Sequence, residues 1–303
     1  MVIKFLKRGI NKIKYIYSTK IYNIYNHIKN KYIIMTPNEM VDKIVNEGYS
    51  LSRFGDGEFE IILNEGDHPG FQDSSEKMSN ELKKVLLSND KKIIIAIQGS
   101  INSVNNFRKK TKNFYRFFYF KNRKKIEKYL NPQKIYGDTL LTRFYIDYDD
   151  KTIADERIPL LKKIWNNKKL LIVEGKDSKL GVGNNLFDNA KSIRRILVPN
   201  CNAYKIKKSI NKTIIENINP NELVLLAIGP TASIIAYDLS KNGIQALDIG
   251  HIDIEYEWYL SGAKEKIEII GKNVNEVNKN NNNNPKIIDD KYLKSIIIDL
   301  SLL

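Results

Sequence analysis

Two acidic residues, Asp56 and Glu58, stand one residue apart between glycines in the run 52–58. In an extended or loop segment, side chains two residues apart project to the same side, so both carboxylates could bind one cation. Mg²⁺ and Mn²⁺ prefer oxygen ligands and commonly take one or two carboxylates together with water and substrate phosphates. The spacing therefore indicates metal-assisted chemistry on a phosphate, although a tight glycine turn would have the same composition.

The elements that must position these acids are short apolar, β-branched runs that alternate with helical stretches. The predicted strands are 49–54, 92–98, 170–173, 195–198, 223–228 and 245–249. This alternation is typical of an α/β fold with a mostly parallel sheet covered by helices. Ligands of such sheets bind at the carboxyl ends of the strands, so the residues that follow each strand are candidates for the site.

A glycine-rich turn follows the predicted strand 170–173. Its candidates for ligand binding are Glu174, Gly175, Gly181, Gly183 and Asn184. Backbone N–H groups in such a turn, and at the start of a following helix, can bind a diphosphate. The Gly-Lys-Ser/Thr ending of a P-loop is absent, so ATP hydrolysis is not indicated. A plain strand-to-helix turn is the alternative.

Two further candidates for anion binding are Gly229 with Thr231, and Arg143. The first pair opens a predicted helix, whose free N–H groups would bind an anion or be capped by Thr231 itself. Arg143 could hold a phosphate or carboxylate, but a structural ion pair is as good an interpretation for a single arginine.

The densest group of ionisable side chains follows the strand 245–249 and contains His251, Asp253, Glu255 and Glu257. In a helix they pair four residues apart, and in an extended chain they share one side, so the acids are expected to converge. They could supply a metal ligand or a general base. A helix start made acidic to complement its dipole would explain Asp253 and Glu255, but not His251.

The chain has 303 residues and a formal charge of +15. Residues 1–31 carry eight Lys or Arg and no acid, and residues 108–128 carry ten with one acid, so the excess charge is local. We therefore expect neither a basic substrate cleft nor a nucleic-acid partner. The single cysteine, Cys201, cannot form an internal disulfide, and no apolar run is long enough to span a bilayer. A cytoplasmic protein fits best.

Three regions are expected along the chain. Residues 1–35 form a basic amphipathic helical extension, which would bind an anionic membrane or pack on its own domain. Residues 36–272 form the main domain, and 273–303 an Asn-rich linker with a short tail that docks or binds a partner. The aromatic and cationic stretch 107–128 could contact an acidic polymer, stack on sugar or base rings, or lie at a lipid headgroup layer. It is best interpreted as an amphipathic helix with its aromatics inside.

Taken together, the motifs resemble the GT-D-type glycosyltransferases. The resemblance rests on 52–58, Thr142-Arg143, 174–175 with 181–184, 229–232, and 248–258, in this order. It implies a Rossmann-like fold and a metal-dependent Asp-x-Glu motif at Asp56 and Glu58, with Mn²⁺ or Mg²⁺. It also implies transfer of a sugar, as by a hexosyltransferase, from a nucleotide sugar, typically a UDP-sugar. The acceptor would be a hydroxyl of a glycan, glycolipid or glycoprotein in bacterial surface polysaccharide or protein glycosylation.

By position and chemistry we assign Arg53, Arg143, the 174–185 loop, Gly229 and Thr231 to donor binding. One carboxylate among Asp253, Glu255 and Glu257 would deprotonate the acceptor, with His251 in a metal or base role. Asn185 departs from the family pattern, in which we expect Asp. The inner face of the cell membrane is the expected location. The alternatives are a methyltransferase-like nucleotide-binding protein and a non-catalytic module that binds membrane or polyanion.

Overall fold

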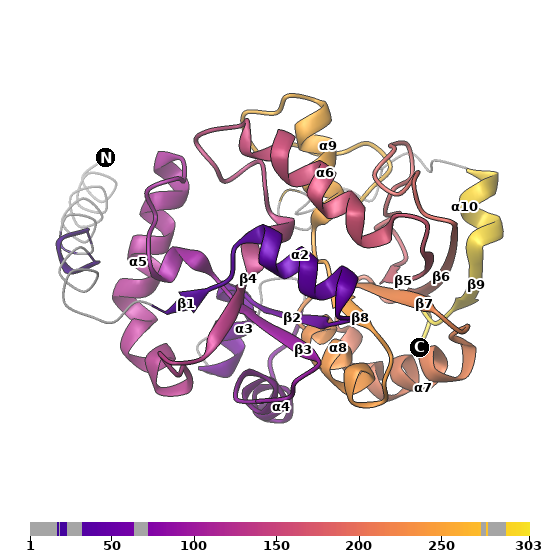
Figure 1. The fold of residues 1–303 in the computed structure, drawn as a ribbon, viewed down its shortest axis with the longest axis horizontal. Helices are drawn as coiled ribbons and strands as arrows, with labels where there is room; N and C mark the ends of the chain where they lie inside the picture. The colour runs from indigo at the N-terminus through magenta and orange to yellow at the C-terminus, as the bar shows by residue number, and fades with distance from the viewer. Residues whose placement is uncertain (1–16, 18, 23–31, 64–71, 274–276, 278–288) are drawn as a thin grey trace, which may run out of the picture.

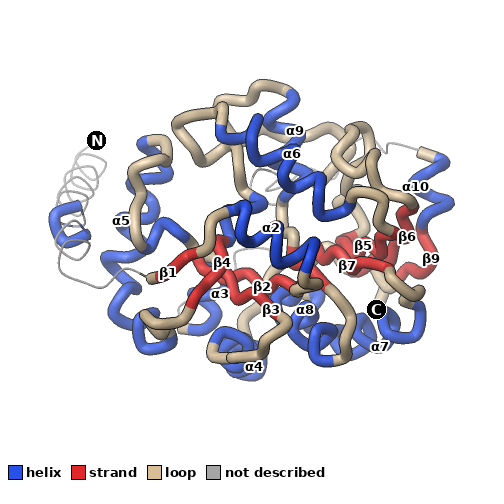
Figure 2. The backbone as a smooth tube through the Cα atoms, in the orientation of Figure 1, coloured by secondary structure: helices blue, strands red, loops and turns tan. Residues whose placement is uncertain are grey.

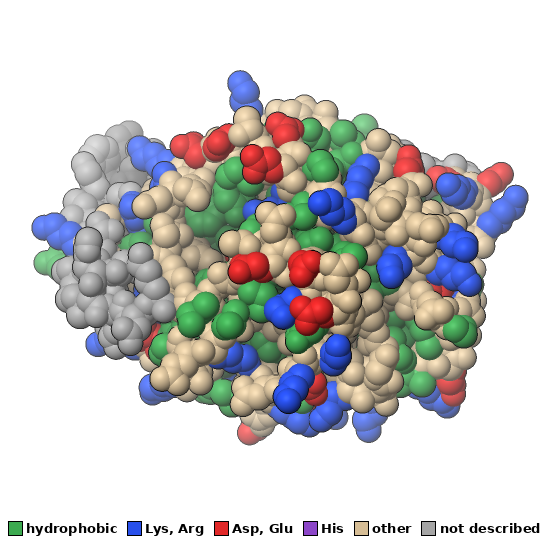
Figure 3. Space-filling model, viewed as in Figure 1, with side chains coloured by type: hydrophobic (Ala, Val, Ile, Leu, Met, Phe, Trp, Pro, Cys, Tyr) green, Lys and Arg blue, Asp and Glu red, His purple; other side chains and the backbone are tan. Residues whose placement is uncertain are grey.

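The computed structural model describes residues 17, 19–22, 32–63, 72–273, 277 and 289–303. Most of the predicted helical extension over 1–35, and most of the predicted Asn-rich linker that begins at 273, lies outside these residues. Within the described ranges no helix has both the length and the apolar character that crossing a bilayer requires. On the face shown in Figure 3, Lys and Arg are interspersed with acidic side chains, in keeping with a local origin of the excess charge.

The described residues build one sheet of nine strands, and all neighbouring strands run parallel (Figures 1 and 2). Its order is β1-β4-β3-β2-β8-β7-β5-β6-β9. The strands are β1 (Ile33–Ile34), β2 (Ser50–Phe54), β3 (Ile93–Ile97), β4 (Ile135–Asp138), β5 (Lys169–Gly175), β6 (Ser192–Val198), β7 (Glu222–Ala227), β8 (Ala246–Asp248) and β9 (Ile296–Asp299). The predicted fold class and all six predicted strands are confirmed.

Helices cover both faces of the sheet (Figure 1). They are α2 (Pro37–Asn46), α3 (Asp56–Ile62), α4 (Glu76–Leu86), α5 (Lys109–Ile126), α6 (Ile153–Trp165), α7 (Lys207–Asn217), α8 (Thr231–Lys241), α9 (Ile252–Leu260) and α10 (Asp290–Ser295). The core on one face joins α2, α6 and α9, and the cores on the other join α3, α4, α5, α7 and α8. Because the sheet is buried on both faces, strands such as β3 are apolar at every position.

Local sequence explains where the first described helix begins and ends. Thr36 caps α2 by accepting from the Glu39 backbone N–H (3.3 Å), while the Glu39 side chain accepts from the Thr36 N–H (2.7 Å). This reciprocal pair of hydrogen bonds is a capping box. Gly48, just after the helix, has a φ of +71°, a conformation that glycine adopts without steric cost.

Three strands, β1, β4 and β9, lie outside the predicted set. β4 contains Gly137, where a Cβ would lie 2.6 Å from Cγ2 of Ile94, so the close packing itself requires glycine. β1 and β9 fall within the two predicted extensions, 1–35 and 273–303, and they extend the sheet of the main domain at its edges. The C-terminal tail therefore docks: β9 pairs with β6, and Tyr292 of α10 packs under Arg195.

Candidate functional site

A cleft of about 580 Å³ lies at the carboxyl ends of β2, β3, β7 and β8, and we call it the main cleft. Six of the predicted site residues line it: Arg53, Asp56, Glu58, Arg143, Gly229 and His251. The cleft therefore joins segments that are nearly 200 positions apart in the sequence. It lies where ligands bind in open parallel sheets.

Arg53 is held firmly in the wall of this cleft. Its guanidinium forms an ion pair with Asp248 at the end of β8 (Nη2 to Oδ1, 2.9 Å) and donates to Oγ1 of Thr142 (2.9 Å). Gly250 has a φ of +48°, and a Cβ there would overlap Nη2 of Arg53. The glycine in the 248–251 motif thus makes room for the arginine. Asp248 belonged to a quoted motif, but the sequence assigned it no role.

Asp56 and Glu58 lie in the first turn of α3, so the expectation of an extended or loop segment is wrong. Glu58 turns back to accept from the Gly55 backbone N–H (2.7 Å), which starts the helix. Asp56 accepts from the side-chain amide of Gln98 at the end of β3 (3.1 Å). Both acids still line the main cleft.

The electrostatics of the cleft suit a cation beside these acids. Burial and the negative charge of Asp248 raise the pKa of Glu58 to about 7, against the lowering effect of Arg53. An added cation would favour the ionised carboxylate. In the part of the chain that the structure describes, no three His, Cys, Asp or Glu side chains converge as a metal centre. Two carboxylates nevertheless fit Mg²⁺ or Mn²⁺ when water and phosphates complete the coordination.

The ionisable side chains predicted to form one group at 251–257 lie at the start of α9 and on it, and they contact different partners. Asp253 and Glu257 converge on the ammonium of Lys272, which is 2.7 Å from a carboxylate oxygen of each. The side-chain amide of Asn184 also donates to both, at 2.8 and 2.7 Å. These two acids therefore take part in a buried polar network, and His251 is the member of the group that lines the main cleft.

Glu255 faces away from Asp253 and Glu257, contrary to the expectation that all three acids converge. Its Oε2 accepts from the backbone N–H groups of Tyr145 and Ile146, at 2.9 and 3.0 Å. Its Oε1 lies 3.8 Å from Nε of Arg143. The fully buried Glu255 thus positions the segment that carries Arg143 into the main cleft.

Glu255 makes the stability of the protein depend on pH. Burial raises its pKa to about 7, partly offset by Arg143. The folded-state pKa of Glu255 exceeds its unfolded value of about 4.3, so its protonation stabilises the folded state. This contribution to the free energy of unfolding is complete below the unfolded pKa and is lost as the pH rises through 7. Replacing Glu255 with Gln removes this titration. Relative to wild type, the variant should gain up to about 3 kcal/mol in the free energy of unfolding between pH 4 and 8.

Urea unfolding of both proteins across this pH range measures the difference. The exposed Glu216 supplies the control, because Glu216→Gln removes only a surface ion pair with Lys212 and should change the stability by less than about 1 kcal/mol. A constant difference between wild type and Glu255→Gln would show that Glu255 keeps an ordinary pKa in the fold.

Both interpretations of the 174–185 turn expected a helix to follow it, whereas residues 176–191 form turns and bends that run directly into β6. Glu174 is fully buried, pairs with Arg195 and accepts from the Leu180 N–H (2.7 Å). It shapes the loop and does not reach the main cleft. Gly175 lines a smaller cavity of about 50 Å³, which Asp253 also lines and which meets the main cleft at Gly229, Gly250 and His251.

Four other predicted donor-binding residues do not line the main cleft. Gly181 has a φ of +74° and packs against the Phe187 ring, and Gly183 has a φ of +79°. Asn184 belongs to the Lys272 network. Thr231 is fully buried, with its hydroxyl 3.3 Å from the side-chain oxygen of Gln72. Of the two residues assigned at the start of α8, only Gly229 lines the main cleft.

Sequence reasoning missed one wall of the main cleft. The missed lining residues are Gln98, Arg108, Lys110, Thr111, Phe114, Tyr115, Asp147 and Lys266. Most belong to the start of α5, which we interpreted as a helix with its aromatics inside. Tyr115, Phe118 and Tyr119 are buried as expected, but Phe114 and Phe117 are exposed. The mixture of aromatic and cationic residues was the available signal.

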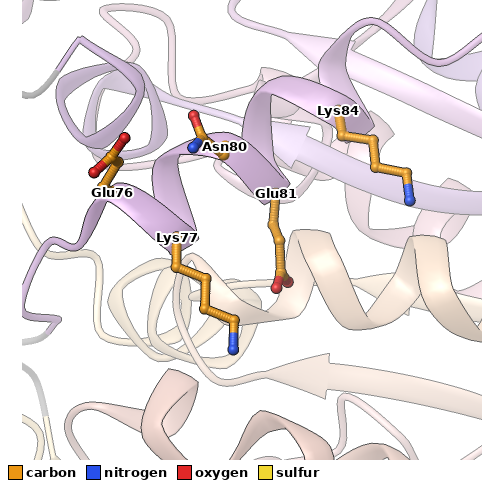
Figure 4. A pocket seen from close by; sticks show the side chains of 5 residues that line it. All are labelled: Glu76, Lys77, Asn80, Glu81 and Lys84. Carbon is orange, nitrogen blue, oxygen red and sulfur yellow. The ribbon is translucent and has the colours of Figure 1, made fainter.

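A hollow of about 510 Å³ on α4 is a weaker candidate for a site (Figure 4). Its lining residues all belong to this one helix: Glu76, Lys77, Asn80, Glu81 and Lys84. Glu81 also pairs with Lys207 (2.7 Å). Because the hollow is lined by one face of a single helix and lies at no strand end, we interpret it as ordinary charged surface.

The fold and the main cleft define a Rossmann-like α/β protein with a cleft at the carboxyl ends of its strands. A family model described as the glycosyltransferase GT-D fold matches residues 51–277. The chain therefore belongs to the GT-D glycosyltransferase fold family, as the sequence motifs suggested.

Curated relatives support this assignment. The chain is 36% identical over 248 residues to a probable glycosyl transferase Gly from Streptococcus gordonii, covering 81% of this chain and 36% of that protein. It is 34% identical over 268 residues to the glycosyltransferase GlyD of Streptococcus pneumoniae serotype 4, covering 86% and 31%. The chain thus spans about a third of the length of these relatives.

Solved structures agree with the family assignment. A structure described as a new glycosyltransferase from Streptococcus sanguinis is 33% identical, with a TM-score of 0.81, and covers 89% of this chain and 100% of that one. A second, described as the highly conserved domain of unknown function 1792 with a distinct glycosyltransferase fold, is 31% identical with a TM-score of 0.83. It covers 95% of this chain and 100% of that one.

Proposed function

We propose that the protein transfers a hexose from a nucleotide sugar, with a UDP-sugar as the favoured donor, to an acceptor hydroxyl in the main cleft. The observation that carries this proposal is the meeting of Asp56 and Glu58 with the glycine turns at 229 and 250 in one cleft. Acids for a metal and backbone turns for phosphates are the two features that a nucleotide diphosphate needs.

Asp56 and Glu58 would hold Mn²⁺ or Mg²⁺, which would neutralise charge on the departing diphosphate. Gly229 leads into α8, an eleven-residue helix whose N-terminal N–H groups favour anions. Arg53 is fixed by Asp248 and Thr142, so its charge is oriented without a loss of side-chain entropy on binding. These groups together support a diphosphate site.

The acceptor hydroxyl must lose a proton as its oxygen bonds to the sugar and the nucleotide leaves. We propose His251 for this role, because it lines the main cleft while Asp253 and Glu257 contact Lys272 and Glu255 contacts the 145–146 backbone. Bacterial surface polysaccharide or protein glycosylation, at the inner face of the membrane, remains our proposed context.

Donor binding is tested by calorimetric titration with uridine diphosphate, with and without Mn²⁺. We expect binding that weakens at least tenfold when the metal is chelated, because the ion that Asp56 and Glu58 would hold would neutralise charge on the phosphates. S-adenosylmethionine serves as the control ligand. Binding of S-adenosylmethionine in place of uridine diphosphate would favour the methyltransferase-like alternative and contradict our proposal.

Catalysis is tested by nucleotide release from a panel of sugar nucleotides. A glycosyltransferase commonly hydrolyses its own donor slowly, so release with one donor class identifies the sugar. The absence of release from every donor, with and without acceptors, would refute the proposed function.

A further inference from the structure

Phe114 is a large apolar side chain near the start of α5 that lines the main cleft and is 47% exposed. Its ring stacks on Phe118 (centroids 6.2 Å apart, planes 18° apart) and meets the edge of Tyr115 (5.3 Å, 66°). Phe118 and Tyr115 are buried. The exposed ring is therefore supported from behind by the core and is preorganised as a flat surface.

The sheet order shows on which side of the acids this ring lies. β2, which leads to Asp56 and Glu58, lies between β3 and β8. The chain passes from β3 into α5, whereas the glycine turns at 229 and 250 follow β7 and β8. The start of α5 and the glycine turns therefore lie on opposite sides of the acid pair.

Direct contacts agree with this order. Gln98 at the end of β3 donates from its side-chain amide to Asp56 (3.1 Å), and the same amide lies 3.3 Å from the hydroxyl of Tyr115. The contacts thus run from Asp56 through Gln98 to Tyr115, and the edge of Tyr115 meets the Phe114 ring. If the diphosphate binds between the acids and the glycine turns, as proposed, the α5 wall of the main cleft is left open to a second substrate.

The same wall carries positive charge. Arg108 and Lys110 line the main cleft and form no ion pair with any residue that the structure describes. Arg108 donates to the backbone carbonyl of Lys264 (3.0 Å), which fixes the guanidinium at the rim. The first turn of α5 contains no acidic residue, so the positive end of the helix dipole adds to these charges.

We propose that Phe114, Arg108 and Lys110 form the acceptor subsite, and that it selects a sugar acceptor carrying a nearby phosphate or carboxylate. This inference rests on the proposed glycosyl transfer. The apolar C–H face of a sugar ring would pack on the Phe114 ring, and the cations would hold the anionic group. Phe114 binds and orients the acceptor and takes no part in the chemical step.

The test compares Phe114→Ala with Phe117→Ala. Phe117 is on the same helix and is 46% exposed, but it lies outside the main cleft, so it controls for loss of an exposed phenylalanine. Three quantities are measured for each protein: the Kd of uridine diphosphate with Mn²⁺, the rate of nucleotide release without acceptor, and the KM for acceptor. The acceptor probes are p-nitrophenyl hexosides, the matching glucuronides and hexose 1-phosphates.

We expect Phe114→Ala to raise the acceptor KM about tenfold while the other two quantities stay within twofold of wild type. Phe117→Ala should leave all three unchanged. The anionic probes should have lower KM values than the neutral hexosides, and an Arg108→Ala, Lys110→Ala double variant should abolish that preference.

Two results would overturn the subsite while leaving the transferase proposal intact. One is a Phe114→Ala variant whose Kd for uridine diphosphate rises while its acceptor KM does not. The other is a wild-type protein that prefers neutral acceptors. By contrast, a wild-type protein that releases no nucleotide from any donor refutes the underlying function, and the subsite with it.

Discussion

Under the proposed mechanism, replacing Asp56 with Asn is expected to lower the rate of sugar transfer by about 10²-fold or more, since Asp56 would be a ligand of the metal that would stabilise the leaving-group charge. Asn keeps the shape of Asp and retains an oxygen that can accept from the Gln98 amide, so the fold should survive. The measurement is kcat for transfer across a Mn²⁺ titration, with circular dichroism as a check on folding.

Glu60 offers a matched control for this experiment. It is an acid on the same helix, α3, but it does not line the main cleft. Glu60→Gln should therefore retain nearly full activity. If Asp56→Asn is as active as Glu60→Gln, and chelation has no effect on either, the metal-dependent mechanism is wrong.

Replacing Lys272 with Met is expected to destabilise the protein by about 3–5 kcal/mol. Lys272 is 1% exposed, and its removal leaves the carboxylates of Asp253 and Glu257 without their cation in a buried position. A buried charge without a partner costs far more than a surface charge, because water cannot replace the lost interaction. Urea unfolding gives the change in the free energy of unfolding.

Lys205 provides the surface comparison. It pairs with Asp73, and both side chains are about two-thirds exposed. Lys205→Met should cost less than about 1 kcal/mol. Equal losses for the two variants would mean that water reaches the Lys272 network. A Lys272→Arg variant keeps the charge and should recover part of the lost stability.

The central part of the fold was predictable because its determinants are local. The strands β3, β5 and β7 are dominated by β-branched and aliphatic residues, and the capping box at Thr36 needs only four residues. β1 has only two residues, and β4 contains Gly137, which strand propensity disfavours but tight packing requires. β9 follows an Asn-rich segment and is a strand because β6 offers an open edge.

Only the site residues that end a strand or closely follow one could be predicted from the sequence. Asp56, Glu58, Arg53 and His251 directly follow or end strands, so the topology alone brings them to one edge. The partner of Asp253 and Glu257 is Lys272, beyond the end of α9 and without a recognisable motif, so the acids looked available for catalysis. The cleft wall from α5 depends on how that helix is rotated, which periodicity does not reveal.

The contact between Gly250 and Arg53 links two positions that are far apart in the chain. Because any side chain at 250 would occupy the space of the guanidinium, neither position can vary alone without disturbing the ion pair to Asp248. For engineering of the cleft wall, position 250 can accept a side chain only when Arg53 is replaced as well. The positive φ of Gly250 restricts that side chain further, to residues such as Asn and Asp that tolerate a left-handed backbone.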